Sequence, residues 1–171
     1  MPNPSPENPL IVVSVSPDGI PSMKNTGQLN FKTKTFHRSK ATYNFLKGFS
    51  KKVKEAMKEG HFDMLPPGTP VGLFVYLKMA SQDGDNVLTT VQETMQNTII
   101  ENDKMVKMGT FVVNDISRGM TEIGVAFLWV LPEEALFDKD VALEYLMRFY
   151  TTTYKGKPIS KIVSEYHIQN I

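Results

Sequence analysis

The sequence predicts one domain of the mixed α/β (α+β) class, a mixed β-sheet with helices packed on it. The run VGLFVYLKM at 71–79 is almost continuously apolar, which is typical of a strand buried on both faces. Strand-like and helix-like patterns follow in the order β, α, β, α, β, β, α, which indicates a mixed sheet covered by helices. A chain of 171 residues with 41% hydrophobic and 22% charged residues can bury one core, and this argues against a disordered or coiled-coil chain.

The chain begins with short extended elements. Four prolines in residues 1–9 predict a flexible proline-rich arm before a single domain at 10–171. LIVVSVS at 10–16 predicts a strand. Residues 22–38 have no clean period, so they predict a loose β-hairpin or an ordered loop.

Longer elements follow the proline-rich breaker at 66–70. Apolar residues at helical spacing predict a helix over about 86–100. Two strands are expected at about 105–114 and 121–130, and a helical segment with an interruption at 132–150. The remaining tail is expected to form a loop and a short strand.

Composition excludes several classes of protein. Without cysteine there can be no disulfide framework, thiol nucleophile or zinc-thiolate site. No apolar run approaches the roughly 18 residues that cross a bilayer, and the first residues carry no basic signal. We therefore expect a soluble intracellular protein with no membrane partner.

The net charge of +1 conceals a strong asymmetry. Residues 24–58 hold ten basic residues and one acid, a net charge of +9. Residues 83–144 hold four basic residues and twelve acids, a net charge of −8. Asymmetry of this kind is a clue to function, although both segments could equally be solvated faces that neutralise each other.

A helix within the basic segment carries two stripes. Ser39 or Thr42 can cap it, apolar residues recur at three- and four-residue spacing, and Gly60 ends it. Four lysines share a second face beside the apolar one: Lys47, Lys51, Lys54 and Lys58. Like charges at this spacing destabilise a helix slightly, and a phosphate backbone is one partner that would compensate.

Three carboxylates are the candidate chemical site. Asp83 and Asp85 stand where the 71–79 strand gives way to a helix, and Asp103 stands where that helix gives way to the next strand. We expect all three to meet at one edge of the sheet if the two strands are neighbours. Clustered carboxylates are hard oxygen ligands that suit Mg²⁺ or Mn²⁺, which activate water in phosphodiester hydrolysis. The alternative is that these acids only cap the helix and form turns.

Two motifs resemble the RusA family of Holliday junction resolvases, which occurs in phages and prophages. D-G-D-N at 83–86 and N-D-K-M-V at 102–106 are similar to its two acidic elements at the right separation. G-I-P-S-M-K-N-T-G at 19–27 and S-K-A-T-Y-N-F-L-K-G-F at 39–49 are similar to its basic loop and first helix.

The resemblance implies a RusA-like nuclease domain that acts as a homodimer in a bacterial cytoplasm. Such a protein is a Mg²⁺-dependent endonuclease of DNA recombination and repair that resolves four-way junctions by paired symmetric nicks. Asp83, Asp85 and Asp103 would hold the metal, and Asn86 would orient Asp85. Basic residues would bind the junction arms: Lys24, Lys32, Lys34, Arg38, Lys40, Lys47, Lys51, Lys54 and Lys58.

The sequence departs from the family pattern at the site. Thr89 stands where the family commonly has a catalytic lysine, and Asn102 replaces the first residue of an acidic pair. Lys104, or Lys78 at the end of the preceding strand, could substitute for the lysine. An alternative function is therefore a branched-DNA-binding protein that cuts weakly or not at all, and a third is a small interaction domain with no DNA role.

Overall fold

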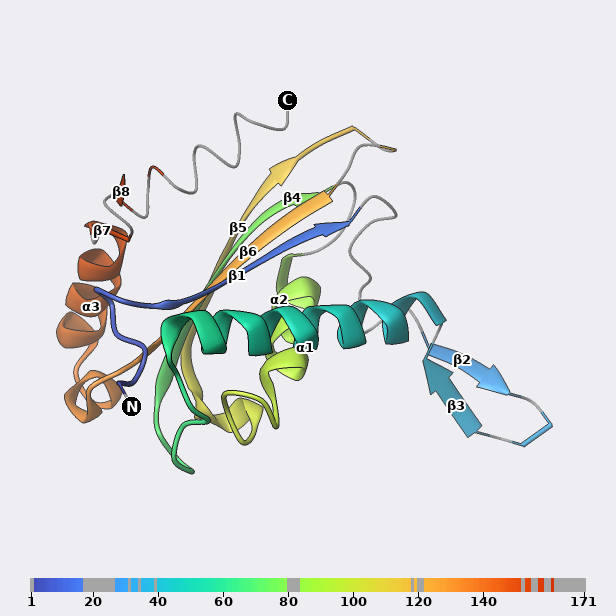
Figure 1. Cartoon of the computed structure of the whole chain (residues 1–171), viewed down its shortest axis with the longest axis horizontal. Coiled ribbons are helices and arrows are strands. Elements are labelled where there is room, and N and C mark those ends of the chain that lie inside the picture. The colour runs from blue at the N-terminus through green and yellow to red at the C-terminus, as the bar shows by residue number, and fades with distance from the viewer. Residues whose placement is uncertain are drawn as a thin grey trace.

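The computed structural model describes residues 2–16, 27–30, 32–33, 35–38, 40–79, 84–117, 119, 122–151, 153–154, 157–158 and 161. Over this part the fold is a four-stranded mixed sheet with helices packed on it, as predicted (Figure 1). The strands of the sheet are β1 (Leu10–Ser16), β4 (Val71–Met79), β5 (Val106–Asp115) and β6 (Glu122–Val130). The helices are α1 (Lys40–Gly60), α2 (Gly84–Met95) and α3 (Lys139–Thr151), with 3-10 turns η1 (Asp103–Met105) and η2 (Glu133–Leu136).

The sheet has the order β1-β6-β4-β5. β6 is antiparallel to both β1 and β4, whereas β4 and β5 are parallel. Every residue of β4 is buried, which confirms the strand predicted from its continuous apolar run. Its central position explains the pattern, because a strand with neighbours on both edges and packing on both faces meets no water.

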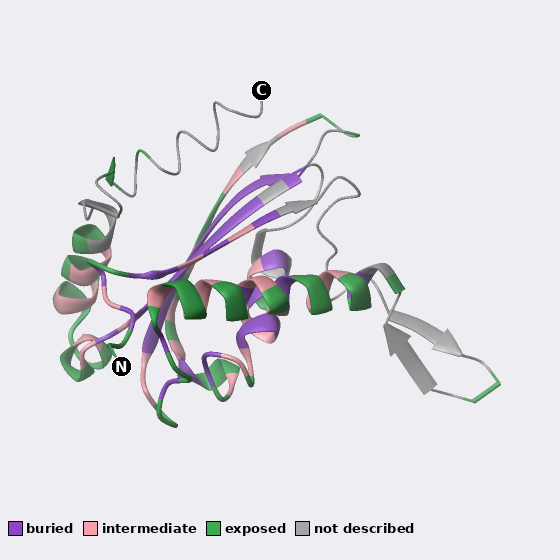
Figure 2. Cartoon of the chain, in the orientation of Figure 1, coloured by how far each residue is buried: buried purple, intermediate pink, exposed green. Residues whose placement is uncertain are grey.

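The two faces of the sheet carry separate apolar clusters. On one face, Leu73, Val75 and Leu77 of β4 pack with side chains from α1 and α2. On the other face, Phe74 and Tyr76 pack with aromatic residues of β6 and with partly buried residues of η2 and α3. The helices therefore cover the sheet from both sides, which places the inner strands in the core (Figure 2).

Gly72 in β4 is required by close packing. It lies opposite Trp129 of β6 in the strand register. A Cβ atom at this position would lie 2.5 Å from two atoms of the indole ring, far inside van der Waals contact. Only glycine therefore allows the fully buried tryptophan to lie against the backbone here.

Helix α1 ends at Gly60, as predicted, but the residue that takes the left-handed conformation at this end is His61 and not the glycine. His61 takes the left-handed conformation with φ of 55°, its N–H donates to the Lys58 carbonyl, and the Phe62 N–H donates to the Met57 carbonyl. This is the Schellman pattern of a helix end. Of the two proposed caps, Thr42 is excluded because it is buried inside the first turn of the helix, and Ser39 lies outside the described residues.

Helix α2 is shorter than the predicted 86–100. It ends at Met95, after which Asn97 has a φ of 56° and Ile99 and Ile100 are buried in a turn. The Leu65 N–H donates to the Ile99 carbonyl, so this turn is held against the segment after α1. The apolar spacing continued past the helix because these two isoleucines fill the same core.

The remaining short elements agree with the predictions. β2 (Gly27–Asn30) and β3 (Thr35–Arg38) form the hairpin expected within 22–38. β7 (Thr153–Tyr154) and β8 (Lys157–Pro158) form a short antiparallel pair in the tail. No helix in the described part of the chain is both long and apolar enough to span a bilayer.

The proline-rich arm contacts the domain over residues 2–9. Pro4, Pro6 and Pro9 are buried, and the Pro4 carbonyl accepts a hydrogen bond of 2.9 Å from the Val130 N–H. Glu7 forms an ion pair with Arg148 of α3. The arm therefore joins the end of β6 to α3.

Candidate functional site

The first acidic motif lies at the start of α2. Asp85 and Asn86 are the second and third residues of this helix, and the structure describes their backbone positions. Asp83 lies outside the described residues. Residues at a helix N-terminus face unpaired N–H groups, so this position suits carboxylates.

The second acidic motif lies beyond the other end of α2. Asp103 is exposed and opens η1, directly before β5. Asn102 caps this turn, because its side-chain oxygen accepts a hydrogen bond of 3.1 Å from the Lys104 N–H. Met105 is buried and anchors the turn, which leaves Asp103 and Lys104 facing solvent.

The strand register separates the two motifs within one chain. β4 and β5 are neighbours, as expected, but they are parallel, and Val71 lies opposite Val106 while Met79 lies opposite Asp115. Asp103 therefore lies near the start of β4, whereas Asp85 follows its end (Figure 1). Eight residues of strand separate these ends by about 26 Å.

The expectation that the carboxylates meet at one edge is therefore wrong for Asp85 and Asp103 of the same chain. The physical reason is the connection itself, because a helix between adjacent parallel strands must carry the chain back to the starting end of the sheet. Among the described side chains, which exclude those of Asp83 and Asp85, no group of three His, Cys, Asp or Glu could hold a metal ion. The roles of Asp83, Asp85, Asp103, Asn86 and Lys104 remain predictions.

The structure also describes Thr89, the residue at the position where the family commonly has a lysine. Thr89 lies one helical turn after Asp85 on an exposed part of α2. Lys78 of β4 is buried, whereas Lys104 is exposed beside Asp103. Lys104 is thus the lysine that solvent or a bound strand can reach, and it belongs to the Asp103 end of the sheet.

Sequence reasoning missed one further acid, Glu122. It opens β6, is only 7% exposed, and precedes Ile123, which lies opposite Lys78 near the end of β4. It therefore shares its end of the sheet with the start of α2. A buried carboxylate is costly unless a partner offsets its desolvation, so its burial distinguishes it from the surface acids. The only signal in the sequence is an acid at the start of an otherwise apolar strand.

The predicted basic stripe forms one exposed surface. Six lysines are exposed along the hairpin turn and α1, and we call them the basic surface: Lys32, Lys40, Lys47, Lys51, Lys54 and Lys58. Figure 2 shows the exposed side of α1, and Figure 1 shows the hairpin projecting beyond its first turn. The opposite side of α1 packs on the sheet through Phe49 and Val53. Lys24 and Lys34 lie outside the described residues, and Arg38 is described in its backbone only.

The dimensions of the basic surface match a nucleic-acid backbone. The eighteen residue steps from Lys40 to Lys58 span about 27 Å of helix, which equals about eight base pairs of duplex. Lys51 has an acidic neighbour on the helix, Glu55 at 3.9 Å, and both side chains are largely exposed. Such an exposed pair contributes little to stability, and the other five lysines of the surface are also exposed.

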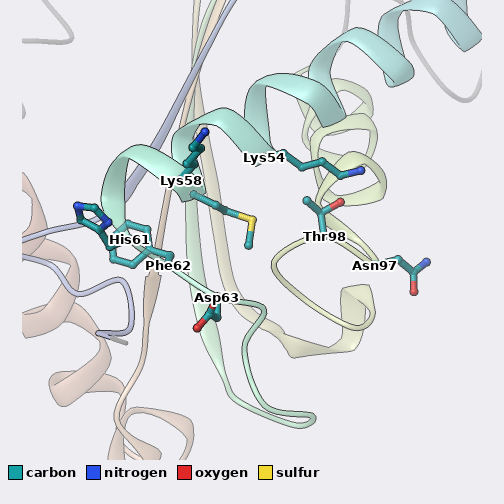
Figure 3. A pocket seen from close by; sticks show the side chains of 8 residues that line it. Lys54, Lys58, His61, Phe62, Asp63, Asn97 and Thr98 are labelled. Atoms are coloured by element: carbon teal, nitrogen blue, oxygen red, sulfur yellow. The ribbon is translucent and has the colours of Figure 1, made fainter.

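A pocket of about 420 Å³ lies at the C-terminal end of α1. Its lining residues come from α1, the segment after it and the turn after α2: Lys54, Met57, Lys58, His61, Phe62, Asp63, Asn97 and Thr98. Figure 3 shows Lys54 extending over Thr98 on the side where Asn97 also lies, with Asp63 pointing away from them. An ammonium beside amide and hydroxyl groups is the set that proteins use to contact phosphate and sugar. The basic surface thus ends in a hollow of the same chemistry.

Comparison of the sequence with protein-family models and with curated proteins finds no match to either. The fold is therefore assigned at the level of its class, a mixed α+β domain with a four-stranded mixed sheet.

Proposed function

We propose that this protein is a metal-dependent endonuclease that binds branched DNA as a homodimer and nicks it at sites completed between two chains. The observation that carries the proposal is the basic surface, whose lysines on α1 extend over about 27 Å of the helix. Its cutting activity rests on the resemblance of 83–86 and 102–106 to the acidic motifs of the RusA family. We also propose that the fold is similar to that of the RusA family.

The basic surface suits a backbone partner better than a protein partner. Lysines are point charges on flexible stems, and they neutralise phosphates without reading base edges. The hairpin turn with Lys32 lies beyond one end of α1, and the pocket lies at the other end. A surface that continues past both ends of one helix fits a bent or branched duplex, for which shape and not sequence decides binding.

Two chains resolve the separation of the acids. One chain has Asp85 at one end of the sheet and Asp103 at the other. In a two-fold symmetric pair of antiparallel chains, the Asp85 end of the sheet in one chain lies beside the Asp103 end of the sheet in its copy. Each pair of ends then gathers the carboxylates of one site, which gives two equivalent sites, as paired nicks require.

The donor set suits Mg²⁺, with Mn²⁺ as the related ion. Carboxylate oxygens are the hard ligands of these ions. A bound ion would supply activation of water and charge stabilisation at the phosphodiester. Asp85 and the Asp103 of the other chain would hold it, and Lys104 would lie beside the scissile backbone.

A second candidate function is binding without efficient cutting. Thr89 carries no charge at an exposed position one turn after Asp85, where a lysine would face a developing phosphorane. Losing one such electrostatic contact costs on the order of 10² to 10³ in rate. A protein with the same basic surface would then recognise branches and protect or present them.

Cleavage of a synthetic four-way junction tests the proposal against a linear duplex of matched length. We expect tighter binding to the junction in Ca²⁺ and symmetric nicks in Mg²⁺ that disappear in Asp85→Asn. Binding of the junction with no nicking in Mg²⁺ or Mn²⁺ would favour the second function. Equal affinity for junction and duplex at moderate salt would refute both functions.

A further inference from the structure

Strand β5 is a long edge strand. It runs for ten residues from Val106 to Asp115, and on the side away from β4 it has no neighbouring strand among the described residues. Phe111 and Val112 are 39% and 41% exposed. Long apolar edge strands bind a further strand unless they are blocked by proline, charge or a covering element.

Among the described residues, the side chains near this edge leave it accessible. Leu88 and Gln92 of α2 lie over the face of β5, since a Cβ atom added at Gly109 would lie 3.5 Å and 3.8 Å from them. Gly109 is nevertheless exposed, as is Lys107. The helix therefore covers the face of the strand and not its edge, and proline is absent from VKMGTFVVND.

The sequence of β5 is complementary to itself in one antiparallel register. A two-fold axis perpendicular to the sheet leaves the same face of both copies on the same side of the combined sheet. Residues that lie opposite each other in the two β5 strands must therefore come from the same face. With Phe111 opposite Phe111 of the second copy, Lys107 lies opposite Asp115 and Thr110 opposite Val112. The axis then carries an aromatic pair, and each flank carries an oppositely charged pair.

We propose that two copies of this chain pair antiparallel through β5, with Phe111 on the two-fold axis, to form a continuous eight-stranded sheet. The occupant is a second copy because the charges of the strand match their own two-fold image. Pairing of the backbones satisfies the N–H and C=O groups along the edge. This pairing is inferred from strand β5 alone and does not depend on the proposed nuclease function.

The pairing also explains how the acidic ends meet, a consequence that rests on the proposed function. The start of the second β5 lies beside the end of the first, where Asp115 is opposite Met79. Asp103 of the second copy then lies at the same end of the sheet as the start of α2 with Asp85. The interface and the completed site are thus produced by one arrangement.

Cross-linking at single introduced cysteines tests the interface, because the chain has no cysteine of its own. In the proposed register, Phe111→Cys brings two Cα atoms to about 5 Å, within the range that a disulfide bridges. Thr110→Cys is the matched control on the same strand, since its copies are about 8 Å apart. Phe137→Cys, 83% exposed beside α3, is the control for another apolar surface.

We expect rapid covalent dimers of Phe111→Cys under mild oxidation, without DNA or metal, and little product from either control. Faster cross-linking of Thr110→Cys or Phe137→Cys would overturn the proposed interface, as would cross-linking of none. The unmodified chain should sediment as a dimer, and Lys107→Asp should weaken it about tenfold because two like-charged pairs result. Adding Asp115→Lys to that variant should restore it. A dimer that forms but does not cut would refute the nuclease and leave this interface intact.

Discussion

A heterodimer with Asp85→Asn in one chain and Asp103→Asn in the other tests whether two chains build each site. If a site takes Asp85 from one chain and Asp103 from the other, this heterodimer has one site with both substitutions and one site that is intact. If a site takes both acids from the same chain, neither site is intact. The same two substitutions therefore give opposite results in the two arrangements.

The magnitude follows from the structure. Within one chain, α2 carries the backbone about 15 Å from Asp85 to Met95, and Asp103 lies still further on. Two carboxylates that share one ion at about 2.1 Å need Cα atoms within roughly 12 Å. We therefore expect about half of the wild-type nicking rate from the heterodimer, and a loss of about 10²-fold or more from each homodimer variant.

The assay uses two affinity tags to purify the heterodimer and a supercoiled plasmid with a cruciform as substrate. Paired nicks by the wild type linearise the plasmid, whereas one intact site leaves a nicked circle. A heterodimer that is as inactive as both homodimers, while it still binds the junction, would refute the reasoning.

Three further predictions concern packing, charge and the missing lysine. Gly72→Ala should lower the free energy of unfolding by about 1–3 kcal/mol, because the added Cβ meets the Trp129 ring. Gly48→Ala, in an open part of α1, should raise the free energy of unfolding by about 0.5–1 kcal/mol. Equal urea midpoints for the two variants would contradict this. Replacing four lysines of the basic surface with serine should reduce the slope of log affinity against log salt by about 3.6, and Lys139→Ser on α3 should leave it unchanged. The four are Lys47, Lys51, Lys54 and Lys58. Thr89→Lys should raise junction cleavage without changing affinity in Ca²⁺, and an unchanged or lower rate would mean that another group such as Lys104 already serves.

Much of the fold follows from local patterns that tertiary structure reinforces. The run at 71–79 is confirmed as β4, because a strand buried on both faces needs apolar residues at every position. The boundaries of α2 could not be predicted, since buried Ile99 and Ile100 continue the apolar spacing into a turn. The positive φ of Asn97, which ends the helical path, leaves no periodic signal.

The candidate site was less predictable because it depends on strand direction. Spacing along the sequence places Asp85 at the start of one helix and Asp103 beyond its end, and that holds in the structure. Whether such residues meet depends on whether the flanking strands are parallel or antiparallel, and β4 and β5 are parallel. Buried Glu122 was missed for the same reason, since only the antiparallel register brings the start of β6 to that end of the sheet.

The strand order also has a consequence for synthesis of the chain. Among the described strands, β1 pairs in the sheet with β6 alone, so residues 10–16 find this partner only after residues 122–130 have been made. At about 5–20 residues per second, the first strand waits on the order of 6–20 seconds on the ribosome. A loop of more than a hundred residues must then close, which predicts slow folding for a domain of this size.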